Sequence, residues 1–444
     1  MKLVNIHKLL IVLVVFLIGD HTVKAQIWTL QQCIDSAQVN NKNLQMSKNN
    51  KEISKQKNKE ATAYLLPKIT ANTDYKYFTN LPYQLMPMSV FNPAIPEGQF
   101  KEAQFGVPHN INANLQLEMP LYNPQIYGGI QATKIASELS ELQYQKTEEQ
   151  IIFEISELYY NAQILYHQIN FIDSNLINAE RLLKNIQLLQ EQLLAKGTDV
   201  NKVKLQVSQL TNQKENILSK YDQVLNMLKF TMGISIKKEI QIDPNISFQE
   251  NKEYLTTNIL DVLIIKSQKH LISNELSILN KSRLFPSINL LGTYGTTGYG
   301  YDKKPNDFLK FYPIGFAGIQ LSYPLFNGTV TQKKIKQKKF ELKNSELQIT
   351  QISEKNDLQI ENTKKQRVVA KKSVETSEAQ IELAHTIYKQ TLLQQAQGTA
   401  TITDVLLADN TLREAQQIYL TAVIDYLKAD LLLRKLAGQL LIKR

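Results

Sequence analysis

The side chains that most often perform chemistry in proteins are sparse in this sequence of 444 residues, and they do not cluster. The single cysteine, Cys33, cannot form a disulfide within the chain. No phosphate-binding glycine loop, nucleophile elbow or zinc motif occurs. The histidines are scattered without the spacing of metal ligands: His7, His21, His109, His167, His270 and His385. We therefore predict that the protein is not an enzyme and needs neither a metal nor another cofactor.

The start of the chain has the pattern of a secretory signal. Lys2 and Lys8 accompany an apolar run over residues 9–18, and residues 23–25 suit a signal peptidase. We expect 1–25 to be the signal peptide, with cleavage before Gln26. The apolar run would cover only about 15 Å as a helix, about half of a bilayer core, so a membrane anchor is the weaker alternative. No later stretch reaches the roughly 18 apolar residues of a membrane-spanning helix.

The chain is basic, with 51 Lys and Arg residues against 41 Asp and Glu residues. Such a balance can indicate a nucleic-acid partner. An exported protein rarely meets nucleic acid, however, and the basic residues are spread along predicted helices. We therefore interpret the charge as solvated surface and expect no nucleic-acid partner.

The sequence repeats itself with an offset of roughly 200 residues, a feature that determines the fold. Four matches occur in the same order in both halves: Leu65–Ile69 with Leu284–Ile288, Met119–Asn123 with Tyr323–Asn327, Gly197-Thr198 with Gly398-Thr399, and Met232-Gly233 with Ala437-Gly438. We predict structural repeats at 26–233 and 253–444, joined by a linker at 234–252. Each repeat should contain a helix, two strands, a very long helix, a turn and a shorter helix.

Two segments of the first half, 69–77 and 110–119, alternate strictly between polar and apolar side chains. Alternation over about ten residues is typical of one strand of a membrane barrel. A soluble, half-buried sheet would show the same period. The aromatic residues that flank both segments favour the interfacial girdle of a barrel: Tyr64, Tyr77, Phe78 and Tyr122.

The strands of the second half alternate less regularly, because Leu291 and Phe316 break the phase, which could indicate a bulge. We place the four strands at 67–78, 110–120, 286–298 and 314–324. Such a sheet cannot close a barrel by itself, and its open edges cannot face lipid. Three chains that pool their strands would give a closed barrel of about twelve, so closure favours a trimer. Residues 81–109, which are rich in proline, and 299–312 would then be loops outside the cell.

Between Tyr127 and Lys196 the sequence contains no proline, and apolar residues recur at heptad spacing. They form an a/d seam over about six heptads. Roughly 70 helical residues would extend about 105 Å, which is too long for a globular domain. The matching segment 330–397 is as long but more polar, so much of its circumference should face water. The wall of a wide, water-filled tube would allow this.

The duplicated plan, the Pro-Leu-Phe-Asn-Gly stretch at 324–328 and residues 398–409 together resemble the TolC-type outer-membrane efflux family. The resemblance covers essentially the whole chain after the signal. It implies a mixed α+β membrane protein with internal duplication. The chains would form a trimeric outer-membrane barrel of about twelve strands. A long, antiparallel coiled-coil tunnel of helices would continue this barrel into the periplasm.

The function that the resemblance implies is that of an exit duct in a tripartite efflux pump or a type I secretion system. Solutes would pass from the periplasm or the pump to the exterior. The implied partners are a periplasmic adaptor (membrane fusion) protein, an inner-membrane pump of the RND, ABC or MFS type, and outer-membrane lipid. The cargo cannot be identified from the sequence.

The resemblance also assigns roles to individual residues. The turns Gly197-Thr198 and Gly398-Thr399 would be the periplasmic tips that the adaptor contacts. In each turn we expect the glycine to end one helix in the left-handed conformation and the threonine to cap the next helix. The prolines at the switches between strand and helix would be Pro67, Pro120, Pro286 and Pro324.

A periplasmic gate is implied at the start of the last long helix. Asp404 falls on the first acidic position of the family pattern, whereas the second acidic position is Leu407 here. A ring of three Asp404 carboxylates would favour cations, but Leu407 makes this ring less charged than the family pattern. Asp409 is a poor substitute, because it lies about 140° away around a helix. The alternative for Asp404 is a solvated acid favoured by the helix dipole.

Two other classes of protein compete with the channel. A periplasmic coiled-coil adaptor or scaffold protein of an envelope transport complex would also contain helical hairpins. Adaptor sheets, however, belong to lipoyl-like and small barrel domains, unlike the alternating segment 110–119 and the duplication. An enzyme of the cell envelope would need a constellation of catalytic residues that the sequence does not contain.

Overall fold

The computed structural model describes residues 27–90, 94, 96–248, 253–255, 259–305 and 307–441. The predicted signal peptide 1–25 and part of the predicted linker 234–252 lie outside the described residues. The chain divides into two compact units, and each unit draws on both halves of the sequence. Unit 1 comprises Met1–Asn49, Leu142–Leu263 and Thr350–Arg444, and unit 2 comprises Asn50–Glu141 and Ile264–Ile349.

Helices make up most of the described chain. They are α2 (Leu30–Asn40), α3 (Lys42–Ala63), α4 (Pro124–Glu191), α5 (Gly197–Met232), α6 (Leu260–Leu284), α7 (Val330–Ala396) and α8 (Ile402–Leu436). The two longest, α4 with 68 residues and α7 with 67, would each extend about 100 Å. Both belong partly to unit 1 and partly to unit 2. The predicted order of helix, two strands, long helix and shorter helix is found in each half of the chain.

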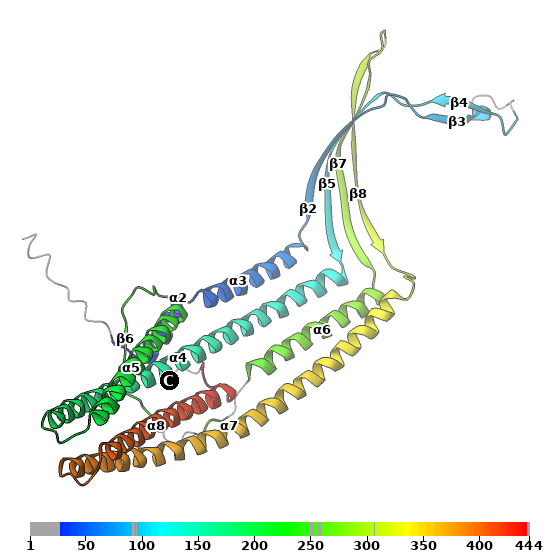
Figure 1. Cartoon of the computed structure of the whole chain (residues 1–444). Coiled ribbons are helices and arrows are strands. Elements are labelled where there is room, and N and C mark those ends of the chain that lie inside the picture. Colours follow the sequence, from blue (N-terminus) through cyan, green and yellow to red (C-terminus); the bar gives the residue numbers. More distant parts are fainter. Residues whose placement is uncertain are drawn as a thin grey trace, which may run out of the picture. The chain divides into compact units, whose positions relative to one another are not determined.

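A four-stranded antiparallel sheet dominates unit 2 (Figure 1), with the strand order β2–β5–β7–β8. These strands are β2 (Lys68–Tyr77), β5 (His109–Tyr122), β7 (Ser287–Tyr301) and β8 (Phe308–Ser322). The four predicted strands are confirmed, although β7 and β8 extend further toward each other. The loop between them is therefore 302–307, shorter than the predicted 299–312. Within the described chain, β2 and β8 are the two edges of this sheet.

The register brings the apolar side chains of all four strands to one face of the sheet. Leu115 stands opposite Ala71 on one side and Tyr294 on the other. Tyr294 in turn stands opposite Gly315 of β8. Ala317 and Ile319 lie two and four residues after Gly315, so their side chains point to the same face. The other face of the sheet is rich in asparagine, glutamine and threonine. On this face Gln116 of β5 stands opposite Thr70 of β2 and Thr293 of β7. The alternation read from the sequence thus corresponds to one continuous apolar face.

The predicted bulge near Leu291 and Phe316 is wrong. The pairing of β7 with β8 is continuous, with Leu291 opposite Gly318 and Thr293 opposite Phe316. Each of the two large side chains faces a smaller residue, so it fits on the polar face without a register change. The irregularity lies instead in β5, between Pro120 and Tyr122. Proline has no N–H to donate to the ladder, which explains a bulge at this position.

The long segment 81–109 contains structure that was not predicted. Its two short strands, β3 (Tyr83–Pro87) and β4 (Phe100–Gln104), form an antiparallel hairpin, and a 3₁₀ turn, η1 (Met88–Val90), follows β3. The proline density suggested an irregular loop. Pro87, however, stands at the end of β3, where the loss of an N–H costs least.

In unit 1 the helices pack as two antiparallel hairpins, α4 with α5 and α7 with α8 (Figure 1). The predicted heptad seam of α4 is confirmed, because Ile155, Ala162, Ile172 and Ile186 are buried. Fully burying an isoleucine contributes about 1.5–3 kcal/mol, so this seam is a main source of stability. Two residues of β1 (Ile27–Trp28), just before the start of α2, pair in parallel with β6 (Gln241–Ile242).

Cys33 lies in the main core cluster of unit 1 and is completely buried. Tyr159 belongs to the same cluster. Burial raises the pKa of the Cys33 thiol to about 12, so the thiol is neutral at physiological pH. We conclude that Cys33 is a packing residue.

Candidate functional site: the helical tips and the gate segment

The first tip joins α4 to α5 over residues 192–196. Leu193 adopts the left-handed conformation, with φ at +61°. The Leu194 N–H donates to the Leu189 carbonyl oxygen at 2.8 Å, and the Leu193 N–H donates to that of Gln190 at 2.9 Å. These bonds satisfy the free carbonyls at the end of α4, as in a Schellman motif.

The expected conformation of Gly197 and Thr198 is wrong. Gly197 is the first residue of α5, and its φ is not in the left-handed region. The residue that precedes α5 is Lys196, which forms no side-chain cap. The physical reason is that α4 already ends at Glu191, so the left-handed residue falls on Leu193, where a side chain costs about 1–2 kcal/mol relative to glycine.

The second tip joins α7 to α8 over residues 397–401. Gly398 is left-handed, as expected, with φ at +76°. Thr399, however, does not cap α8, because its hydroxyl donates backward to the Gln394 carbonyl oxygen at 3.0 Å. The cap is Thr401, whose Oγ1 accepts from the Asp404 N–H at 3.2 Å.

The two tips have the same backbone pattern once they are compared in space. Leu193 stands where Gly398 stands, and Lys196 where Thr401 stands. The structural correspondence is therefore shifted by four residues from the sequence match of Gly197 with Gly398. A repeated Gly-Thr pair is too short to fix the helix register, whereas the length of the preceding helix does fix it.

Asp404 is the third residue of α8 and takes part in a capping box with Thr401. The Thr401 N–H donates to Asp404 Oδ2 at 2.8 Å, and the Thr401 hydroxyl donates to the same oxygen at 2.7 Å. These hydrogen bonds lower the pKa of the Asp404 carboxyl. The carboxylate is exposed and satisfies the start of its helix, which is the role that the alternative interpretation gave it. Leu407, one turn later, leaves 66% of its surface exposed.

Asp409 is buried among the helices, so it cannot replace the missing second gate acid. It accepts a hydrogen bond from Gln206 of α5, and its Oδ2 lies 2.9 Å from Arg413 Nε. Burial raises the pKa of the Asp409 carboxyl, although Arg413 and Gln206 oppose this rise. Tyr388 of α7 lies in the core cluster that also contains Ala408 and Leu412; burial raises the pKa of Tyr388 to about 12, and the charge of Asp409 adds to this rise. This network was not predicted, although the i,i+4 spacing of Asp409 and Arg413 was a signal for the ion pair.

Further polar contacts join α8 to the first hairpin. Lys202 Nζ donates to Thr403 Oγ1 at 3.1 Å. The amide nitrogen of Asn175 donates to Gln416 at 2.8 Å, and that of Gln168 donates to Gln417 at 2.8 Å. Apolar side chains of α4, α5, α7 and α8 complete the contact near the tips. The two hairpins of unit 1 are therefore joined by a row of hydrogen bonds as well as by a core.

The four prolines predicted at the switches between strand and helix lie close to strand ends. Pro67 and Pro286 immediately precede β2 and β7, and Pro324 follows β8 by two residues. Pro120 instead lies inside β5, beside its bulge. Each position tolerates the missing N–H of proline, and this backbone requirement alone accounts for them.

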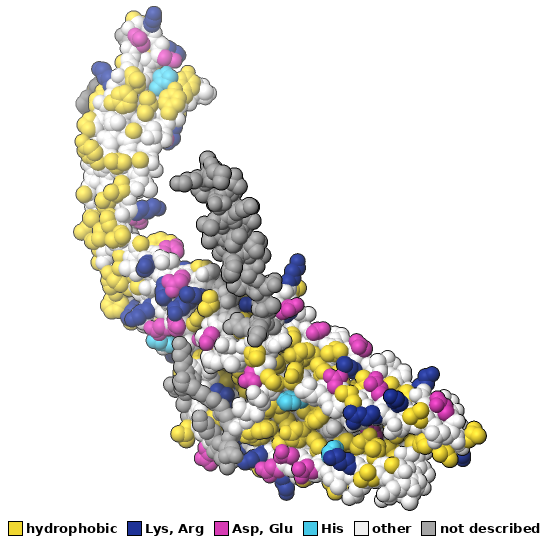
Figure 2. All heavy atoms as spheres, turned by 90° about the vertical axis from the view of Figure 1, so that its left-hand side faces the viewer, with side chains coloured by type: hydrophobic (Ala, Val, Ile, Leu, Met, Phe, Trp, Pro, Cys, Tyr) yellow, Lys and Arg dark blue, Asp and Glu magenta, His cyan; other side chains and the backbone are white. Residues whose placement is uncertain are grey.

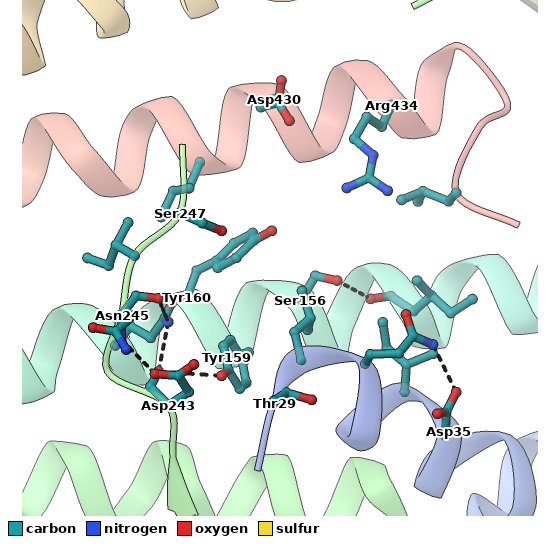
Figure 3. Close-up of a pocket in the computed structure, with 18 of the residues that line it drawn as sticks. Thr29, Asp35, Ser156, Tyr159, Tyr160, Asp243, Asn245, Ser247, Asp430 and Arg434 are labelled. Carbon is teal, nitrogen blue, oxygen red and sulfur yellow. Dashed lines mark hydrogen bonds between the residues drawn. The ribbon is translucent and has the colours of Figure 1, made fainter. Parts of the chain in front are cut away.

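A cavity of about 710 Å³ opens in unit 1 between α2, α4, residues 243–247 and the end of α8 (Figure 3). Its polar side chains mainly brace the backbone. The Tyr159 hydroxyl donates to the Trp28 carbonyl oxygen at 3.1 Å, and Gln163 Nε2 donates to those of Asp243 and Asn245 at 2.8 and 2.9 Å. Asp430 accepts from the Tyr254 hydroxyl at 2.9 Å and pairs with Arg367 at 2.8 Å. No nucleophile beside a base is found among the residues that line this cavity.

The described residues include no group of three or more His, Cys, Asp and Glu side chains placed to hold a metal ion. His109 Nδ1 forms a hydrogen bond with the Tyr75 hydroxyl at 2.8 Å, and His167 Nε2 forms one with the Pro244 carbonyl oxygen at 2.9 Å. Within the described part of the chain, none of the helices combines the length and the apolar character that a membrane span requires.

Comparison with known proteins gives a consistent result. Residues 277–439 match the family model described as outer membrane efflux protein. Outer membrane protein TolC of Salmonella enteritidis is 20% identical over 464 residues, which cover 98% of this chain and 87% of that protein.

Solved structures share the fold at low sequence identity. VceC of Vibrio cholerae has a TM-score of 0.74 at 14% identity and covers 92% of this chain and 96% of its own. The CmeC outer membrane channel of Campylobacter jejuni has a TM-score of 0.73 at 14% identity, covering 92% and 85%. MtrE of Neisseria gonorrhoeae, in its open state, has a TM-score of 0.71 at 15% identity, covering 92% and 88%.

A four-stranded sheet with one apolar face, combined with two hairpins of very long helices, is the fold that this chain shares with these outer-membrane proteins. The chain is similar to the TolC-like outer membrane efflux proteins, through the family model over residues 277–439 and through TolC itself over nearly the whole chain. It is a transport protein of the outer membrane, and its helices lie in the periplasm.

Proposed function

We propose that three copies of this chain form one closed barrel of about twelve strands and act as the exit duct of a tripartite efflux pump or a type I secretion system. The observation that carries the proposal is the sheet of unit 2, which has one apolar face and two open edges. In lipid, each backbone group left unpaired at such an edge costs several kcal/mol. Pooling sheets removes every edge.

The strand directions agree with this closure. Because β2, β5, β7 and β8 alternate in direction, β8 of one copy runs antiparallel to β2 of the next. The barrel would therefore remain antiparallel at every seam, as membrane barrels are. The apolar face would meet lipid, and the face that carries Asn72, Asn114 and Gln116 would line the duct.

Disulfide cross-linking across the seam tests this arrangement. In a Cys33→Ala background, cysteine would replace Asn72 in β2 together with Phe316, Gly318 or Gln320 in β8. One of these pairs should give cross-linked trimers on oxidation. The matched control pairs Asn72→Cys with Thr293→Cys in β7. These positions are two strands apart in one sheet, about 10 Å, which is too far for a disulfide. A stable, folded monomer in the membrane would refute the trimer.

We infer that the two tips contact a periplasmic adaptor protein, through Gly197, Thr198, Gly398 and Thr399 and the residues between helices. Support comes from the resemblance to the family and from the apolar surface of the first tip, where Leu193 is 92% exposed. A large apolar side chain in water and in a strained conformation needs a compensating contact. The inner-membrane pump that completes the assembly would be of the RND, ABC or MFS type.

Capture of the adaptor tests the tip proposal. Leu194→Asp should weaken co-purification with the cognate adaptor from chemically cross-linked cells. Met227→Asp makes the same chemical change at an exposed residue near the other end of α5 and should leave the capture unchanged. Equal capture of the adaptor by both variants would show that the tips do not form the interface.

We propose that Asp404 and Leu407 form the periplasmic gate where three copies meet. The exposure of both side chains at the start of α8 supports this role. The capping box limits it, because Asp404 keeps its carboxylate close to Thr401. The ring would therefore be a fixed constriction of one acid and one leucine per chain, without a second acid.

A further inference from the structure

The helix ends that adjoin the sheet of unit 2 carry an unusual density of exposed basic side chains. We name this set the basic girdle: Lys57, Lys59, Lys281, Arg283, Lys333, Lys334, Lys336, Lys339 and Lys343. All of them lie in unit 2. Figure 2 shows Lys and Arg side chains gathered at the end of the hydrophobic column that follows the sheet.

The acids of the same helices are mostly engaged elsewhere. Glu141 pairs with Lys51 at 2.6 Å, and Glu346 pairs with Lys269 at 2.9 Å. Glu275 and Glu341 both pair with Lys338, each at 2.7 Å. None of the girdle residues forms an ion pair with any described residue. Their charge is therefore available to a partner outside the chain.

A belt of exposed apolar residues separates the girdle from the sheet. Tyr64 and Leu66 lie between α3 and β2. Leu284 ends α6 and Phe285 follows it before β7. Leu325 and Phe326 lie between β8 and α7. Leu325 and Phe326 are 90% and 83% exposed. The same order thus recurs at three of the junctions between sheet and helices: an apolar strand, then the apolar belt, then the basic side chains.

This order matches the layers of one bilayer leaflet. Aromatic side chains favour the boundary between acyl chains and headgroups, and Lys and Arg favour the headgroups. At about 1.5 Å per residue, Lys333 and Lys336 begin about 5–9 Å into α7, which is close to the depth of one headgroup layer. Lys336, Phe340, Lys343 and Leu347 follow one another along one exposed stripe of α7, about 80–140° around the helix from the buried Ile335.

We propose that the basic girdle binds anionic phospholipid headgroups of the periplasmic leaflet of the outer membrane. The inference rests on the proposed membrane function, because that function gives the sheet its orientation. It goes further in assigning lipid selectivity to named residues. Each basic residue near an anionic surface strengthens attachment about fivefold, and the effect falls off within about 10 Å at 0.1 M salt.

Native mass spectrometry of the full-length protein tests the proposal. The protein, purified in neutral detergent, would receive equal amounts of phosphatidylglycerol and phosphatidylethanolamine. We expect bound phosphatidylglycerol to exceed bound phosphatidylethanolamine. The triple variant Lys333→Gln, Lys336→Gln and Lys339→Gln should reduce this preference about tenfold or more. The same positions changed to arginine should retain it.

The matched control changes the same helix by the same charge: Lys355→Gln, Lys365→Gln and Lys372→Gln. These lysines are exposed and lie further along α7, so this variant should keep the lipid preference of the wild type. Equal loss in both triple variants would overturn the proposal, and so would no loss in either.

A third measurement separates this proposal from its main alternative. If the girdle lined the duct and attracted anionic solutes, its triple variant would change the ratio of anion to cation permeability in planar bilayers and leave the lipid preference intact. That result would also overturn the proposal. Failure of the wild type to form trimers and conduct would instead contradict the proposed function. A conducting trimer without lipid preference would contradict only the girdle.

Discussion

Removal of Arg413 should destabilise the helical hairpins in a way that depends on pH. Arg413 is the cationic partner of the buried Asp409, with 2.9 Å between Nε and Oδ2. Arg413→Met keeps the side-chain stem but leaves the carboxylate with Gln206 as its hydrogen-bond donor. Losing one member of a buried pair costs about 3–5 kcal/mol. Because the Arg413 side chain is 23% exposed, we expect a value at or below the lower end of this range, about 2–3 kcal/mol at neutral pH.

The sign of the pH dependence follows from burial. The pKa of the Asp409 carboxyl is already raised in the folded state, so this group binds a proton more tightly when folded. Its ionisation therefore removes stability as the pH rises from its unfolded pKa of about 4. Arg413 lowers the folded pKa, so its loss raises that pKa further. The cost of Arg413→Met should then be largest at neutral pH and shrink as the pH falls toward 4.

Chemical unfolding followed by far-ultraviolet circular dichroism, on the detergent-solubilised protein at several pH values, measures this effect. The double variant Asp409→Asn with Arg413→Met should recover most of the lost stability, because it removes the uncompensated charge. Lys364→Met is the control, since it breaks an exposed pair with Glu361 on α7 and should change little. A loss for Arg413→Met that is the same at every pH would refute an uncompensated buried carboxylate as its cause.

Three further results are expected. Leu193→Gly should stabilise the first hairpin by about 1 kcal/mol, and Gly398→Leu should destabilise the second by a similar amount, because both residues have left-handed backbone conformations. Shifts of the opposite sign in chemical unfolding would contradict this. Asp404→Ala should weaken cation preference and block by divalent cations in single-channel recordings, and unchanged currents would leave Asp404 as a helix cap. Cys33 should react with a maleimide only after unfolding, because it is completely buried and its pKa is raised to about 12; rapid labelling of the native protein would show that its core opens.

The strands and long helices could be predicted because their signals are local. Alternation over 110–119 fixes which side chains share a face, and the heptads of α4 fix its buried seam. The helix ends could not be located as well. Whether α4 stops at Glu191 or continues to Lys196 depends on packing near the tips between helices far apart in sequence. A Gly-Thr pair contains no information about that packing.

The network around Asp409 was missed for a related reason. Gln206 stands 203 residues before Asp409 in the sequence, so no local pattern connects them. The hairpin of β3 and β4 was not predicted for a different reason. Its strands have five residues each, which is too few for a clear alternation of polar and apolar side chains. The trimer, in contrast, was inferred from an absence of partners at sheet edges, a physical argument that needs no long-range contact.

The unequal tips have a consequence for any protein that meets them. Around the three-fold axis of the proposed trimer, six hairpin ends would alternate between two kinds. One kind presents Leu193 and Leu194 without a capping side chain at Lys196, and the other presents Gly398 and Thr399 followed by the capping box of Thr401. A partner ring of six identical subunits would therefore contact an apolar hairpin end and a hydroxyl-bearing hairpin end in alternation. Such a ring must bind half of its positions differently from the other half, or use subunits in pairs.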